Sequence, residues 1–184
     1  MKKILVVVDV QNDFVSGTLG SEAAQSRIDA ICKKISEFTG GRIYTTQDTH
    51  AADYLETREG TLLPVRHCVK PEAGWQIQAD VAAAIGLKLE EDASVSLESV
   101  EKPTFGSEAL IDKMAEYIGT DEAEVCFVGF CTDICVLSNA ILAKARFFDR
   151  AEIVVDASCC AGVTEEKHLA ALEVMKSCQI IINN

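Results

Sequence analysis

Cys135 is the residue of this sequence whose position most favours chemistry. The apolar run Val125–Val128 has the composition of a buried strand, and Thr132 and Asp133 after it are residue types typical of a helix N-cap. Cys135 therefore falls in the first turn of a helix predicted over residues 132–147. The positive end of the helix dipole and its unpaired N–H groups favour a thiolate there and can stabilise an oxyanion. The sequence predicts a nucleophilic cysteine and, with it, acyl transfer.

Two ionisable residues follow other predicted strands. Asp9 comes directly after the apolar run Ile4–Val8, and Lys102 follows a strand predicted over Ser94–Val100. Because parallel strands end at the same edge of a sheet, both side chains can converge on Cys135. Asp9 could then accept the thiol proton and return it to a leaving amine, while Lys102 stabilises the thiolate or orients Asp9. On this hypothesis, replacing Lys102 by alanine costs much rate and little stability.

Each of these three residues also has a plainer interpretation. Asp9 alone could cap a turn, Lys102 before Pro103 could be solvated, and Cys135 could be a core residue. It is their joint placement after three strands that favours a site. No histidine in the sequence has an obvious claim to pair with Cys135.

A long segment between Gln47 and Pro71 has little periodicity, and a loop of this length inside a compact domain is usually functional. It carries Asp48-x-His50 and, further on, His67. These nitrogen and oxygen ligands have a spacing suited to a divalent metal. The alternative is a polar loop whose residues only pack beside the crevice.

The composition bounds the remaining possibilities. The 184 residues suit one domain over 1–184, and a hydrophobic fraction of 48% argues against disorder. The net charge of −12, from 17 basic and 29 acidic residues, makes nucleic acid an unsuitable partner. No apolar run approaches the roughly 18 residues that span a bilayer, and Asp9 interrupts the first run too early for a signal peptide. We therefore expect a cytoplasmic protein in which most of the eight cysteines are small buried hydrophobes.

Strand-like runs alternate with amphipathic helical patterns along the whole chain. This alternation predicts an α/β protein: a three-layer α/β/α arrangement around a mainly parallel, roughly six-stranded sheet. The predicted strands cover residues 4–8, 42–46, 94–100, 125–128, 152–155 and 179–182. The predicted helices cover residues 28–38, 75–85, 110–118, 132–147 and 165–177. In such sheets ligands bind beyond the carboxyl ends of the strands.

Four motifs resemble the nicotinamidase and isochorismatase-like cysteine hydrolase family, and they follow one another in that family's order. They are Val8–Phe14 (VDVQNDF), Lys102–Ser107 (KPTFGS), Gly129–Val136 (GFCTDICV) and Asp156–Thr164 (DASCCAGVT). The resemblance spans nearly the whole chain. It implies the isochorismatase-like hydrolase fold and assembly as a homo-oligomer.

The resemblance also assigns roles to individual residues. It implies a catalytic triad of Asp9, Lys102 and Cys135. It further implies a cis peptide bond before Cys131, with the N–H groups of Cys131 and Cys135 forming an oxyanion hole. The cysteine at position 135 places the chain on the amidase side of the family, because isochorismatases proper lack this nucleophile.

The segment with Asp48, His50 and His67 resembles the metal site of nicotinamidases, in which zinc or iron takes up the pyridine nitrogen of the substrate. Some members have a further histidine in the intervening loop, and others use a glutamate. This chain has no histidine there. Glu59 is the favoured fourth ligand because of its distance from the segment Leu62-Leu63-Pro64, and Glu56 is the alternative.

The predicted function is a cysteine amidohydrolase that releases ammonia from a small amide through a thioester, with nicotinamide as the leading substrate. Phe14, Trp75, Phe105 and Phe130 could form apolar walls for a planar substrate. One alternative is a related hydrolase of a carbamoyl or ureido compound, for which the metal-like cluster is unnecessary.

Another alternative is a non-catalytic protein on the same scaffold, with an oxidation sensor made of Cys131, Cys135, Cys159 and Cys160. His168 lies on the apolar stripe of the last predicted helix, where a packing or surface role is expected rather than chemistry.

Overall fold

The computed structural model describes residues 1–184 and is built on one six-stranded sheet. All neighbouring strands are parallel, in the order β3-β2-β1-β4-β5-β6. The strands are β1 (Lys2–Val8), β2 (Gly41–Asp48), β3 (Val95–Lys102), β4 (Ala123–Phe130), β5 (Ala151–Ala161) and β6 (Ile181–Asn183). The parallel sheet predicted from the alternating pattern is confirmed.

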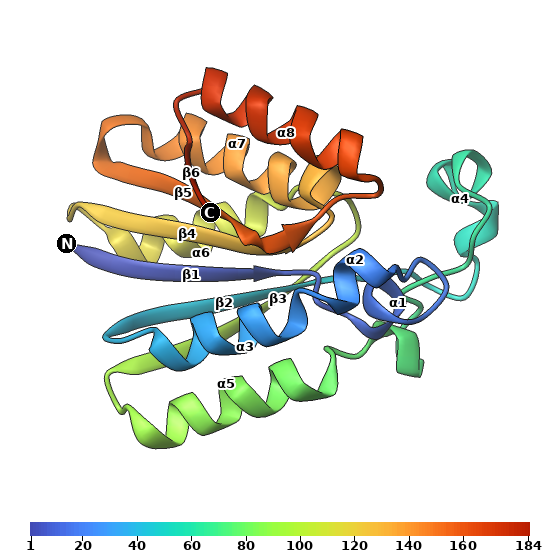
Figure 1. Cartoon of the computed structure of the whole chain (residues 1–184), viewed down its shortest axis with the longest axis horizontal. Helices are drawn as coiled ribbons and strands as arrows, with labels where there is room; N and C mark the ends of the chain where they lie inside the picture. Colours follow the sequence, from blue (N-terminus) through green and yellow to red (C-terminus); the bar gives the residue numbers. More distant parts are fainter.

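Helices cover both faces of the sheet, as Figure 1 shows, so the predicted three-layer arrangement is also confirmed. One face packs against α3 (Ile28–Glu37) and α5 (Ala79–Glu91); the other packs against α6 (Glu108–Ile118), α7 (Leu137–Phe147) and α8 (Glu165–Ser177). The short helices α1 (Asn12–Val15), α2 (Glu22–Gln25) and α4 (Arg58–Leu62) lie at the carboxyl ends of the strands, where α4 projects from the body (Figure 1). None of the helices combines the length and apolarity needed to cross a bilayer.

The central strand β1 shows why this sequence forms a sheet buried on both faces. Leu5 and Val7 contribute to the core under α3 and α5, whereas Ile4, Val6 and Val8 contribute to the core under α6, α7 and α8. Side chains alternate between the two faces of a strand, so a strand that is covered on both sides needs a continuous apolar run. The run ends at Asp9, and the chain leaves the sheet there.

Strand register brings the ends of four strands to one place. Val8 of β1 pairs with Thr46 of β2 and with Gly129 of β4, and Asp48 at the end of β2 pairs with Lys102 at the end of β3. Gly129 is required for the close approach of β4 to β1, because a Cβ there would lie 2.1 Å from the carbonyl oxygen of Val8. The residues after β1 and β4 are therefore neighbours in space.

Several boundaries differ from the predicted ones. The helix expected over 75–85 begins later and runs further, as α5, because a 3₁₀ turn, η2 (Ala73–Trp75), precedes it and Gln78 caps its first turn by accepting from the Val81 N–H. Strand β5 is longer than expected and reaches Ala161. The other short turns are η1 (Tyr54–Glu56) and η4 (Phe148–Arg150).

The segment after β4 was predicted to be a helix capped by Thr132 and Asp133, and this N-cap prediction is wrong. The chain forms one π-helical turn, η3 (Thr132–Val136), before α7, and the residue at its N-cap is Cys131, which makes no side-chain capping bond. The side chains of Thr132 and Asp133 are used instead in contacts with the segment around α8. Cys135 thus lies within η3.

Candidate active site

The structure brings Asp9, Lys102 and Cys135 together at the carboxyl edge of the sheet. Lys102 Nζ lies 2.7 Å from Asp9 Oδ2 and 3.5 Å from Cys135 Sγ. The three residues are 0%, 1% and 5% exposed, so their charges interact with little screening by water. The Lys102 ammonium also donates to the carbonyl oxygen of Thr104 at 3.0 Å, which fixes its position.

Asp9 is held in one conformation by its backbone and by contacts to both carboxylate oxygens. Its φ of +48° lies in the left-handed region, which aspartate tolerates better than most residues. Thr46 Oγ1 accepts from the Asp9 N–H at 3.1 Å and donates to Asp9 Oδ1 at 2.6 Å. The other oxygen, Oδ2, is buried against the Lys102 ammonium, 2.7 Å away. Thr46 therefore holds one carboxylate oxygen and Lys102 the other.

The surroundings of Cys135 oppose the thiolate that a helix start favours. Burial, followed by the charge of Asp9, raises the pKa of Cys135 well above its ordinary value, and the opposing effect of Lys102 does not compensate. Burial also raises the pKa of Asp9, against the lowering effect of Lys102. For Lys102 itself, burial lowers the pKa, but Asp9, Cys135 and Asp48 together raise it overall.

The turn that carries Cys135 has the backbone geometry that the family resemblance implied. The Phe130–Cys131 peptide bond is cis. The Cys131 carbonyl oxygen accepts from the N–H groups of Ile134 and Val136, both at 3.1 Å. The oxyanion-hole role of the Cys131 and Cys135 N–H groups stays a prediction.

Asn139 is a supporting residue that the sequence reasoning missed. It is fully buried on α7, and its Nδ2 donates to the Cys135 carbonyl oxygen at 2.8 Å. Its Oδ1 accepts from the Ser107 N–H at 3.0 Å. Asn139 therefore ties η3 to the loop after Lys102. A lone amide on the apolar side of a predicted helix was the only signal for it.

A cavity of about 450 Å³ opens beside Cys135. Phe14, Phe105 and Phe130 line it, as predicted for a planar substrate, and Cys131 and Cys135 face it as well. Polar groups from the end of β2 and the segment after it form another part of the wall; they are Asp48, Glu59 and His67. A ligand in this cavity can therefore contact the thiol and these polar groups at the same time.

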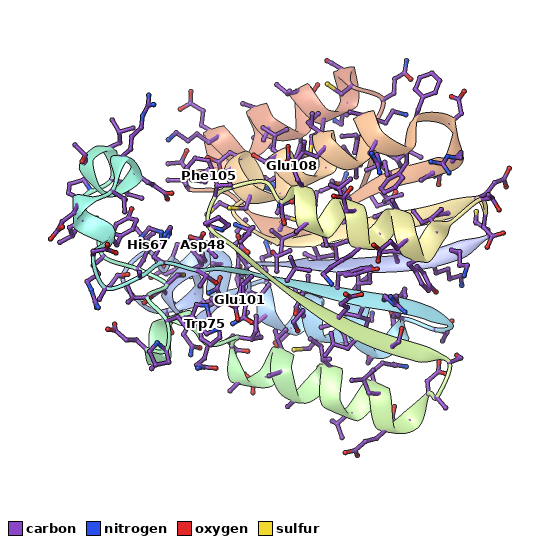
Figure 2. All side chains as sticks on the ribbon, turned by 180° about the vertical axis from the view of Figure 1, so that it is seen from behind. Asp48, His67, Trp75, Glu101, Phe105 and Glu108 are labelled. Atoms are coloured by element: carbon purple, nitrogen blue, oxygen red, sulfur yellow. The ribbon has the colours of Figure 1, made fainter.

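Trp75 does not line the cavity, so its predicted substrate contact is corrected. Its indole Nε1 donates to Thr49 Oγ1 at 2.9 Å, and the Lys70 ammonium lies 4.9 Å from its ring centre. The 3₁₀ turn η2 that contains Trp75 packs against α1 rather than over the thiol. Figure 2 shows Trp75 at the same end of the sheet as Asp48, His67 and Phe105.

The four predicted metal ligands form one cluster. Asp48, His50, Glu59 and His67 each offer a ligand atom, and these atoms all lie within 4.8 Å of one another. Asp48 Oδ2 lies 3.0 Å from His50 Nε2 and 3.4 Å from His67 Nε2, and Glu59 Oε1 lies 3.8 Å from His50 Nε2. The cluster includes Glu59, the favoured ligand, and not the alternative Glu56.

The chemistry of this donor set fits a divalent transition metal. The Nδ1 of His67 lies 2.7 Å from the Val65 carbonyl oxygen, which is the contact that leaves Nε2 as a lone-pair donor toward the cluster. Two imidazoles with two carboxylates suit zinc or iron. Burial opposes ionisation of Asp48, but His50, His67 and Lys102 together hold its pKa well below the ordinary value. A charged carboxylate is the form that binds a cation.

Gln11 positions the first of these ligands. Its Oε1 accepts from the Asp48 N–H at 2.7 Å, and its Nε2 donates to the Asp48 carbonyl oxygen at 2.9 Å. The side chain is fully buried. Lys102 Nζ lies 3.7 Å from Asp48 Oδ1, so the metal-like cluster and the thiol group are contiguous.

The isochorismatase domain family matches residues 3–183. The chain belongs to this family. A curated isochorismatase-family relative, described as uncharacterized and named PncA, from Bacillus subtilis (strain 168), is 28% identical over 94% of this chain and 93% of its own length. As a member of the isochorismatase family with this site, the protein is a hydrolase that acts on C–N amide bonds.

Solved structures of isochorismatase-family enzymes superpose over nearly the full chain. The nicotinamidase/pyrazinamidase PncA from Bacillus subtilis has a TM-score of 0.84 with 27% identity, covering 100% of both chains. The pyrazinamidase of Pyrococcus horikoshii, solved in complex with zinc, has a TM-score of 0.75 with 28% identity, covering 99% of this chain and 98% of that one. The N-carbamoylsarcosine amidase from Thermoplasma acidophilum has a TM-score of 0.76 with 21% identity and shows the shared fold alone; it covers 100% of this chain and 96% of that one.

Proposed function

We propose that this protein is a nicotinamidase, which hydrolyses nicotinamide to nicotinate and ammonia through a thioester on Cys135. The observation that carries the proposal is that one cavity is lined both by Cys135 and by Asp48, Glu59 and His67. A pyridine amide has a carbonyl carbon for the thiol and a ring nitrogen for a metal. Relatives named nicotinamidase or pyrazinamidase, one of them solved with zinc, support the same substrate class.

The geometry suggests the order of proton transfers. Asp9 Oδ2 takes the Cys135 thiol proton as Sγ attacks the amide carbonyl carbon, and the N–H groups of Cys131 and Cys135 receive the resulting oxyanion. Asp9 then gives the proton to the departing nitrogen, so that ammonia leaves and a thioester remains. A water molecule, deprotonated by Asp9, attacks the thioester and releases nicotinate with the thiol restored.

Lys102 interacts with both Asp9 and Cys135 during these steps. Its ammonium keeps the Asp9 carboxylate oriented through the 2.7 Å contact, and it lies 3.5 Å from the sulfur as negative charge develops there. The walls of Phe14, Phe105 and Phe130 exclude water from the ring of the substrate.

Asp48, His50, Glu59 and His67 would hold the divalent ion. When bound, the ion supplies a Lewis-acid contact for the pyridine nitrogen, so it orients the substrate and takes no part in generating the nucleophile. The residues of the chain itself therefore carry the bond-breaking steps.

Ammonia release from a set of amides tests the proposed substrate. Protein loaded with zinc or iron is expected to hydrolyse nicotinamide, and to hydrolyse benzamide much more slowly because benzamide lacks the ring nitrogen. N-carbamoylsarcosine represents the alternative class of carbamoyl and ureido compounds. No ammonia from nicotinamide with the metal-loaded protein, or faster release from the carbamoyl compound, would overturn the assignment.

The metal content of ligand variants tests the cluster separately. We expect the double variant His50→Ala, His67→Ala to lose bound zinc or iron, as measured by elemental analysis after dialysis, because only two oxygen ligands remain. Glu56→Ala is the matched control, since Glu56 lies outside the cluster and its loss should leave metal content unchanged. Equal metal content in both variants would contradict the assignment.

The alternative of a redox-responsive protein has less support from the site. Sensor cysteines are exposed and have a low pKa. Burial instead raises the pKa of Cys131 to about 12, and burial also raises the pKa values of Cys159 and Cys160 above the ordinary range.

A further inference from the structure

His168, for which the sequence analysis expects only a packing or surface role, contacts the turn that carries Cys135. Its Nδ1 lies 2.8 Å from Thr132 Oγ1, across 36 residues of sequence. Thr132 is 0% exposed and His168 6% exposed. This contact is the one side-chain hydrogen bond that either residue makes with the protein. Water is largely excluded from both groups, so each depends on the other for a partner.

A second contact joins the same two segments. Asp133 Oδ1 accepts from the Val163 N–H at 2.9 Å. Gly162 permits this approach, because a Cβ at that position would lie 2.8 Å from Asp133 Oδ1 and 2.9 Å from the His168 backbone nitrogen. Residues 162–168 therefore pack directly on η3 through one backbone contact and one side-chain contact.

The contacts from residues 162–168 hold the turn that carries the residues of the proposed reaction. η3 contains Cys135, and Cys131 immediately precedes it. Thr132 lies between these two residues in the sequence, so its side chain anchors the same turn that carries both of them. Val163 and Lys167, from the same supporting segment, line the substrate cavity. The segment thus contacts the substrate space on one side and the nucleophile turn on the other.

We propose that His168 is a positioning residue for the reaction, which acts through Thr132 to hold η3 in the orientation that aims Cys135 Sγ at Asp9 and at the substrate carbonyl. The proposal rests on the nucleophilic role of Cys135 in the proposed function. His168 does not touch the substrate. Its contribution is to fix the position of the Thr132 hydroxyl group. Loss of this contact should therefore lower kcat and leave substrate affinity nearly unchanged.

Two pairs of substitutions separate the hydrogen bond from packing. Thr132→Val and His168→Leu remove the hydrogen bond with similar side-chain volume. Thr132→Ser keeps the hydroxyl, and His168→Asn keeps a polar atom near the place of Nδ1. If His168→Leu fails to fold, Thr132→Val and Thr132→Ser still test the proposal, because each of them changes few atoms.

The first measurement is the rate at which iodoacetamide alkylates Cys135 in the metal-loaded protein, followed by mass spectrometry of the peptide that contains it. We expect Thr132→Val and His168→Leu to slow alkylation by about tenfold, the effect of one lost buried hydrogen bond on a reaction that needs the aligned turn. Thr132→Ser and His168→Asn should stay within about threefold of the wild type. The Thr132→Val, His168→Leu double variant should be no slower than either single variant, because both remove the same interaction.

The second measurement is ammonia release from nicotinamide, in which kcat should fall in parallel with alkylation while KM stays nearly constant. Wild-type alkylation in both disruptive variants would overturn the proposal. So would conservative variants as slow as the disruptive ones, because that result would show a packing role alone.

The alkylation assay needs no substrate, so it separates this inference from the proposed function. Slowed alkylation in a protein that does not hydrolyse nicotinamide would support the positioning role and reject only the substrate.

Discussion

Replacing Cys135 by alanine is expected to lower kcat for amide hydrolysis by at least about ten-thousand-fold, to the level of residual binding effects. The reason is that Cys135 lines the cavity and its Sγ lies 3.5 Å from Lys102 Nζ, whose charge stabilises the thiolate as it attacks a carbonyl carbon. The fold should survive, with a loss of unfolding free energy of about 1 kcal/mol for a small buried side chain. Ammonia release and thermal unfolding of the same preparation measure both quantities.

Cys159→Ala is the matched control for this experiment. Cys159 is also buried, at 3% exposure, but it lies in β5 and does not line the cavity. The control should retain wild-type kcat. If Cys135→Ala kept substantial activity, the thioester mechanism would be wrong.

Lys102→Met is expected to damage both activity and stability. Lys102 is 1% exposed and lies within 2.7 Å of Asp9 and 3.7 Å of Asp48, so its removal leaves buried carboxylates without their cation. We expect unfolding free energy to fall by about 3 kcal/mol and kcat to fall by at least about a hundredfold. Because Lys102 is buried, the expected loss of stability is larger than the sequence alone indicates for replacement by alanine. Urea denaturation and ammonia release provide the two measurements.

The Asp9→Asn, Lys102→Met double variant distinguishes the two effects of Lys102. Removing both members of a buried ion pair costs much less stability than removing one, so the double variant should regain part of the lost unfolding free energy. It should stay inactive, because Asp9 Oδ2 is also the proton acceptor. Wild-type stability in Lys102→Met itself would contradict the claim that this ammonium balances the buried carboxylates.

The parts of the site that could be predicted from sequence are those fixed by strand ends. Asp9 follows an apolar run that is buried on both faces, and Lys102 ends the strand that pairs with β2 in register at Asp48. Parallel strands place such positions at one edge whatever the details of packing. The family motifs then added the cis peptide bond before Cys131, which the structure contains.

The features that sequence reasoning missed depend on contacts between distant segments. Thr132 was assigned to a helix N-cap, but its hydroxyl bonds to His168, and no periodicity in residues 125–147 contains that information. Trp75 was assigned to the cavity, whereas a bond to Thr49 holds its indole elsewhere. The thiol of Cys135 was expected to be ionised because of the helix start, yet burial and Asp9 dominate its pKa. Propensity rules describe neighbours in sequence, and these outcomes are set by neighbours in space.

The central claim is that Cys135 becomes acylated during turnover. Metal-loaded protein can be mixed with excess nicotinamide, quenched in acid during steady-state turnover and digested for peptide mass spectrometry. We expect a nicotinoyl group on the peptide containing Cys135, absent when the protein is Cys135→Ala. Two results would contradict the proposed mechanism. One is active turnover with no acyl group on Cys135 under conditions where the thioester should accumulate, and the other is an acyl group on a different residue.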